Sequence, residues 1–203
     1  VNYTGLPDRS PIWYITGAED EEANQYFNSL LYLSYNGPYN VVQTFQDVSE
    51  VIGWSNTTLI DENHLIQTRQ IGDEFSAEKM EWYQFAAPPT TSQHTGLWYT
   101  PSQAGWGESI STQGQVRGAV HYLYDQSGEP YWTIGWGLND NSSVDMIYTQ
   151  SFCPSCPRIE PVNTVVGSSK LTLTDQFDGT LDSISIQVPS SLRNNATWQK
   201  TNL

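Results

Sequence analysis

Runs of alternating apolar and polar residues, separated by turns rich in Gly and Pro, recur along most of the chain. In residues 117–124, for example, Val120, Tyr122 and Tyr124 fall on one side. A period of two residues indicates a half-buried β-strand. The pattern predicts an all-β protein of antiparallel strands, arranged as a sandwich or as barrel-like modules.

Two parts of the chain resemble each other. The run SPIWYITG at 10–17 matches EPYWTIG at 129–135, and VIGWSNTTLID at 51–61 matches VVGSSKLTLTD at 165–175. Self-similarity at a nearly constant offset indicates a duplicated unit.

Nothing in the first part matches residues 96–120. We therefore expect one partial and one complete repeat. A partial β module over 1–86 corresponds to the second half of the unit, a linker covers 87–95, and a complete module covers 96–203. The missing half would lie before Val1 or be supplied by another polypeptide.

One segment fits two secondary structures. Apolar residues between 23 and 31 have helical spacing behind the acidic residues 19–22, and a helix dipole favours acids at that end. The corresponding segment of the second copy, 144–148, is short and apolar, as is typical of a strand. We predict a strand over 26–33, with one short helix as the alternative.

Three blocks of the second unit resemble a module that is common in secreted bacterial proteins. The first is GLWYTPSQAGWG at 96–107, the second is YLYDQSGEPYW at 122–132, and the third is VGSSKLTLTD at 166–175. That module has a Gly-x-Trp-Tyr-x-Pro-x-x-x-Gly-x-Gly opening, a Tyr-Asp-x-x-Gly-x-Pro-x-Trp middle and a Val-Gly-x-x-x-Leu closing strand. The resemblance implies an exported all-β accessory unit and brings no catalytic residue with it.

The charge of the chain restricts its partners. The 203 residues include 22 acids and 8 Lys or Arg, for a net charge of −14. Nucleic-acid binding depends on basic side chains that neutralise phosphates, so we expect no nucleic-acid partner. No apolar run approaches the roughly 18 residues that span a bilayer, so we expect no membrane insertion.

Cys153 and Cys156 lie in a CPSC run. Such a pair can be a redox site, half of a zinc site or a local disulfide. A zinc site needs two more ligands, and Pro157 and Pro161 disfavour the helix that activates a redox cysteine. We expect a disulfide and no cofactor, in keeping with an extracellular or cell-surface location.

The sequence offers weak candidates for catalysis and metal binding. Glu108 follows a Gly-Trp-Gly turn and could belong to a pair of carboxylates that cleaves glycosides, although a solvated acid on a strand face is the commoner case. The oxygen-rich loop with Asp140, Asn141 and Asp145 could hold calcium, but it lacks the EF-hand pattern. We expect a polar turn there and no metal site.

Aromatic residues give the strongest functional signal. Exposed rings stack on the apolar faces of sugars, whereas sheets also use Trp and Tyr for packing. We expect most rings of the central stretch to be core, and Trp106 and Trp136 to form a surface platform. The candidate ligand-binding residues are Trp106, Trp136, Trp98, Tyr99 and Glu108.

The sequence thus predicts an exported, non-catalytic β protein that binds a glycan or another cell-surface polymer through exposed aromatic residues. One alternative is a structural subunit of a filament or surface layer, in which strand exchange between copies completes the partial module. The other is a hydrolase that uses Glu108 with a second carboxylate.

Overall fold

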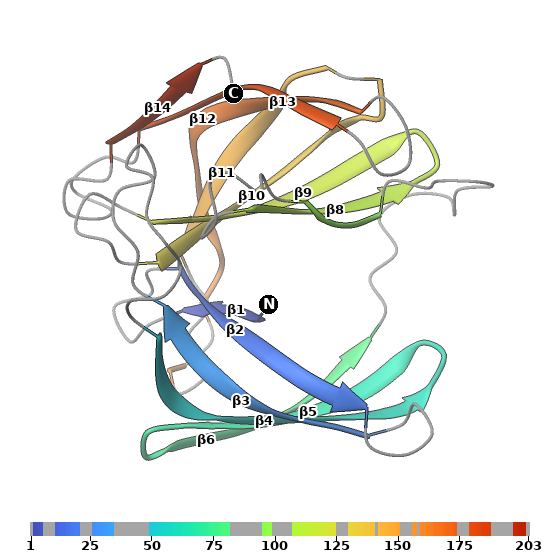
Figure 1. The fold of residues 1–203 in the computed structure, drawn as a ribbon, viewed down its shortest axis with the longest axis vertical. Coiled ribbons are helices and arrows are strands. Elements are labelled where there is room, and N and C mark those ends of the chain that lie inside the picture. Colours follow the sequence, from blue (N-terminus) through green and yellow to red (C-terminus); the bar gives the residue numbers. More distant parts are fainter. Residues whose placement is uncertain are drawn as a thin grey trace.

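The protein is all-β. The computed structural model describes residues 2–5, 11–20, 26–34, 49–81, 95–98, 107–124, 130–140, 142–150, 156–157, 159–173, 179–187 and 197–201, and these contain strands and turns but no helix. The strand predicted over residues 26–33 is confirmed, since β3 spans Tyr26–Ser34. Figure 1 shows two antiparallel sheets, one above the other.

The first sheet has six strands in sequence order. Tight turns join its last three strands: the Asp61 carboxylate accepts a hydrogen bond from the Asn63 amide at 2.8 Å, and Gly72 has a φ of 56°. Glycine adopts that left-handed conformation without steric cost. The strands are β1 (Asn2–Gly5), β2 (Pro11–Asp20), β3 (Tyr26–Ser34), β4 (Ser49–Asp61), β5 (His64–Ile71) and β6 (Glu74–Glu81).

The second sheet has eight strands, also in sequence order. Gly114, with a φ of 59°, makes the tight turn between the second and third of them. The strands are β7 (Gly96–Trp98), β8 (Gly107–Gln113), β9 (Val116–Tyr124), β10 (Pro130–Leu138), β11 (Val144–Gln150), β12 (Val162–Leu173), β13 (Gly179–Gln187) and β14 (Thr197–Thr201).

The eight-stranded sheet curls over on itself without closing into a barrel (Figure 1). Side chains of β9 reach β12 although β10 and β11 lie between them in the sheet: His121 contacts Ser169, and Arg117 contacts the Leu171 carbonyl. We call the face that looks into this curl the inner face and the opposite one the outer face.

Burial differs from the sequence-based expectation on β9. Val120, Tyr122 and Tyr124 do share a face, and the two tyrosines form a buried cluster with Trp132, against which Val120 and Ile134 pack. The other face of β9 is buried too, so the prediction of a half-buried strand is wrong. The reason is the curl, which covers the inner face, while β2 of the six-stranded sheet contacts the neighbouring strands β10 and β11.

The two sheets share a strand order over β2–β6 and β10–β14 within the described residues. They also share a register. Ile15 pairs with Tyr32 in the first sheet, and Ile134 pairs with Ile147 in the second, which are matching positions of the two copies.

A β-bulge lies at the same place in both sheets. Leu31 pairs with Gly53 and Met146 with Gly167, and the register shifts immediately after each of these pairs. Gly53 and Gly167 therefore occupy equivalent positions, as their sequence context predicts. A bulge is a conserved device for bending a strand, so the duplication extends to local backbone shape.

The sheets differ beyond β2 and β10. β9 pairs with β10 along its whole length, from Pro130 to Leu138, and β8 and β7 follow. β1 pairs with β2 only from Pro11 to Tyr14. The predicted linker over 87–95 lies outside the described residues except for Thr95, so its role stays a prediction.

Candidate functional site

Two places in the eight-stranded sheet collect chemically active side chains, one on each face. On the inner face, Trp98, Glu108, His121 and Thr133 lie side by side on β7, β8, β9 and β10, because each pairs directly with the next. Trp98 is half-buried and stands at the sheet edge, whereas the next three are buried. The row therefore leads from the edge strand into the interior.

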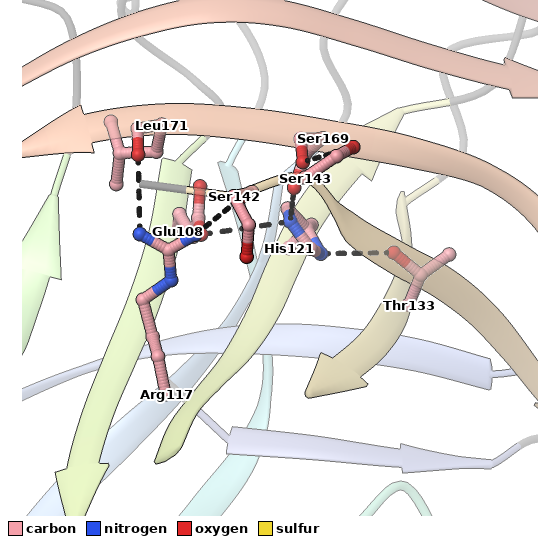
Figure 2. A network of polar contacts seen from close by, with 8 residues as sticks. All are labelled: Glu108, Arg117, His121, Thr133, Ser142, Ser143, Ser169 and Leu171. Atoms are coloured by element: carbon pink, nitrogen blue, oxygen red, sulfur yellow. Dashed lines mark hydrogen bonds and ion pairs between the residues drawn. The ribbon is translucent and has the colours of Figure 1, made fainter. Parts of the chain in front are cut away.

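His121 is at the centre of a polar network (Figure 2). Its Nδ1 lies 3.2 Å from the Thr133 hydroxyl, and its Nε2 lies 2.8 Å from the Ser169 hydroxyl on β12. A neutral imidazole has one donor and one acceptor nitrogen, so one hydroxyl accepts and the other donates. The network ties the two sides of the curl together.

Arg117 makes a second link across the curl. It is 1% exposed and donates to the Leu171 carbonyl at 3.1 Å and to the Ser142 carbonyl at 3.0 Å. Its Nε and the hydroxyl of its neighbour Thr112 have no hydrogen-bond partner among the described residues. A buried cation held mainly by carbonyls is costly, and it acts electrostatically on the groups around it.

Burial decides the charge states of the acid and the base. It raises the pKa of the Glu108 carboxyl to about 7, although the positive charge of Arg117 acts to lower it. Burial is also the main cause that lowers the pKa of His121 to about 3. The positive charge of Arg117 lowers this pKa as well, whereas a hydrogen bond with Thr133 acts to raise it. His121 is thus neutral near pH 7, and its 3.6 Å contact with Glu108 is not an ion pair.

The network suits a structural role better than a catalytic one. Ser169, His121 and Glu108 are 2%, 1% and 4% exposed, so a substrate does not reach them in this conformation. The charged group that acts on Glu108 in the described part of the chain is Arg117, not a second carboxylate. Glu108 is also not the solvated acid that the commoner case predicts.

On the outer face, the aromatic residues separate into two groups along β10. Trp132 is 7% exposed and belongs to the buried tyrosine cluster. Trp136, four residues on, is 42% exposed, and Leu138 next to it is also exposed. The Trp132 end of this face is therefore covered, and the Trp136 end is open to solvent.

Gly118 and Ser111 lie beside Trp136 across the sheet. Gly118 is the cross-strand neighbour of Trp136 on β9 and pairs in turn with Ser111 on β8. Gly118 is buried, and Ser111 is half-buried and shares the outer face. The hydroxyl of Ser111 therefore lies two strands from the ring, beyond a covered glycine.

Of the other predicted site residues, Trp98 and Glu108 lie together on the inner face, away from Trp136. Tyr99 and Trp106 lie outside the described residues, so the platform of Trp106 and Trp136 stays a prediction. The sequence pattern did not predict the inner network, although Arg117 and His121 opposite an aromatic face were a signal that both faces of β9 are covered.

The weaker candidates have ordinary surroundings. The Asp140 carboxylate accepts a hydrogen bond from the Ser142 amide at 3.0 Å, as expected for a polar turn, and Asp145 is exposed on β11. Asn141 and Cys153 lie outside the described residues, so the disulfide between Cys153 and Cys156 stays a prediction. In the described part of the chain, no group of three or more His, Cys, Asp or Glu could hold a metal ion.

Comparisons with known proteins do not assign a function. No protein-family model, curated protein or solved structure matches the chain. Over the described residues, no helix is long and apolar enough to cross a membrane.

Proposed function

We propose that this chain is an exported, non-catalytic β protein that binds a glycan on the outer face of its eight-stranded sheet, with Trp136 as the main contact. The exposure of Trp136 carries the proposal. Trp136 is 42% exposed and Leu138 is 56% exposed, so one end of a strand whose other tryptophan is buried presents a ring and an aliphatic side chain to solvent.

The surroundings of the ring fit a sugar. The face of a pyranose packs flat on an aromatic ring through dispersion and CH–π contacts. Leu138, two residues after Trp136 on β10, adds exposed apolar surface, and the half-buried Ser111 offers a hydroxyl two strands away. Export is supported by the motif resemblance of residues 96–203 and by the Cys153–Cys156 spacing.

Replacement of Trp136 by alanine tests the proposal. Because the ring supplies most of the apolar contact, W136A should weaken binding about tenfold or more. Binding is measured by retardation in native gels that contain a soluble polysaccharide and by intrinsic tryptophan fluorescence. The matched control is F75A, since Phe75 is 62% exposed on the other sheet and should not matter.

The proposal fails if W136A binds as well as the parent protein, or if F75A causes the same loss. Far-UV circular dichroism and a thermal melt show that both variants fold. Since Trp136 is at the surface, its truncation should leave the melting temperature nearly unchanged.

A second candidate is assembly by strand exchange, and one observation favours it. Residues 15–20 of β2 pair with β3 on one side, while β1 covers only Pro11 to Tyr14 on the other. Unpaired strand edges bind further strands through backbone hydrogen bonds. Because β2 also contacts β10 and β11, its edge is not fully accessible to a strand from another chain. We therefore prefer glycan binding as the proposed function.

A further inference from the structure

We infer that the glycan is an uncharged pyranose polymer, and that Asp145 beside Trp136 determines this preference. The inference rests on the proposed function and adds the ligand class and a specificity-determining residue. Asp145 enters the sequence analysis only as a weak metal candidate, and its place in the sheet gives it a different role.

Close approaches between β10 and β11 place the two residues near each other. Ile134 pairs with Ile147, and the antiparallel order brings the residues after Ile134 alongside those before Ile147. The backbone of Asp145 then lies against Gly135, the residue before Trp136. A Cβ built on Gly135 would lie 2.0 Å from the Asp145 carbonyl oxygen, and one built on Gly137 would lie 2.9 Å from Val144.

Side chains of β11 point alternately to the inner and the outer face, and Asp145 lies on the outer face. Val144 and Met146 are buried at 1% and 0% exposure, whereas Asp145 between them is exposed. Asp145 pairs with Ser168 on β12, which is half-buried. The outer face thus carries Ser111, Gly118 and Trp136 as paired neighbours across β8 to β10, and Asp145 and Ser168 as paired neighbours across β11 and β12. We call these five positions the outer row.

This row combines the groups that recognise a neutral sugar. The ring provides the stacking surface, and a carboxylate accepts two hydrogen bonds from neighbouring hydroxyl groups of one pyranose. Ser111 and Ser168 lie at either side and can donate or accept. The spacing of adjacent strands, about 5 Å, matches the size of one sugar ring, so an extended chain can lie across the strands.

Charge selects against acidic glycans. Asp140 and Asp145 are exposed acids, four and nine residues after Trp136 in the chain, and hydrogen bonds from Ser142 lower the pKa of Asp140, which keeps it ionised. The chain as a whole has a net charge of −14. Arg117, next to Gly118, is buried on the inner face, and Lys170, two residues after Ser168, is a single exposed base that does not reverse the balance.

The test compares uncharged and acidic polymers on the same variants. Affinity gels contain hydroxyethyl cellulose, laminarin or arabinoxylan as uncharged probes, and polygalacturonate or alginate as acidic ones. The parent protein should be retarded by at least one uncharged probe and by neither acidic one. D145N should weaken that binding about tenfold, because it removes the charged acceptor.

Two further variants separate the inference from the proposed function. D145K should weaken uncharged binding and admit the acidic probes, while D73N, an exposed acid in the turn between β5 and β6, should change neither. Suppose that W136A weakens binding as expected, but that acidic probes bind as tightly as uncharged ones and D145N has no effect. The proposed function then stands, and the role assigned to Asp145 is wrong. If no probe binds, or W136A has no effect, the proposed function falls and takes this inference with it.

Discussion

Glu108 shows how the environment of one residue overrides its type. Its position beside glycine and tryptophan in the sequence suggests a surface acid near a turn, yet it is 4% exposed. Paired with His121 and Trp98, it lies on the face that the curl of the sheet covers. The consequence is a carboxyl group that the folded protein prefers to keep protonated near neutral pH.

The pH dependence of stability follows from the two buried groups. Glu108 has a folded pKa of about 7, above its usual 4.5, so the folded state holds a proton that the unfolded state has lost, and stability falls as the pH rises from 4.5 through 7. His121 has a folded pKa of about 3, below its usual 6.5, so stability rises with pH between 3 and 6.5. The two effects oppose each other between 4.5 and 6.5.

E108Q isolates the effect of the acid. Relative to the parent protein, E108Q should become more stable as the pH rises from 5 to 8, by about 2 kcal/mol, because an amide does not lose a proton. Denaturant unfolding at several pH values measures the difference. The control variant E160Q replaces an exposed acid, and its stability should change with pH in the same way as that of the parent protein. Parallel curves for E108Q and the parent would show that Glu108 is not held protonated.

At the level of elements, the bulge that β4 and β12 share marks a close approach of strands. A Cβ at Gly53 would lie 1.8 Å from the Gln70 carbonyl oxygen, a backbone atom that cannot rotate away. By contrast, nothing lies within 4 Å of a Cβ built on Gly72, whose only constraint is its φ of 56°. The two glycines are therefore required for different reasons.

The pair G53A and G72A separates steric from conformational cost. G53A should destabilise the protein by about 2–3 kcal/mol because β4 and β5 must move apart. G72A should cost only about 1 kcal/mol, the penalty for a left-handed alanine. Urea unfolding measures both. A cost for G53A no larger than that for G72A would contradict the close strand approach.

At the scale of the whole molecule, the contact of β2 with β10 and β11 joins two sheets that repeat the same strand order. Equivalent strands, β2 and β10, thus face each other across the contact. The first sheet ends in the short β1 where the second continues through β9, β8 and β7. Within the described residues, the second sheet has a buried polar network, whereas residues 15–20 of β2 in the first sheet pair with a strand on one side only.

Residues 15–20 of β2 pair with only one strand among the described residues, and this leads to a prediction about self-association. If strand exchange completes the first sheet, analytical ultracentrifugation should show oligomers that grow with protein concentration. Backbone amides within residues 15–20 should at the same time become protected from hydrogen exchange. A monomer at every concentration, with unchanged exchange at these amides, would remove the assembly candidate.

The sequence by itself determined the all-β architecture and the matching places of the two copies. Alternating side chains and turn residues act locally, and a repeated pattern such as that around Gly53 and Gly167 specifies the same pairing twice. It also predicted that Trp106 and Trp136 are exposed rings. Trp136 is exposed, Trp106 lies outside the described residues, and the ligand-binding role of both is still a proposal.

Only the tertiary structure decided which faces meet. The curl that covers His121 and Glu108 arises from contacts between residues far apart in the chain, such as that of His121 with Ser169. Local periodicity tells which side chains share a face of a strand, but not whether a second layer covers that face. For this reason the inner network could not be read from the sequence, while the strands that build it could.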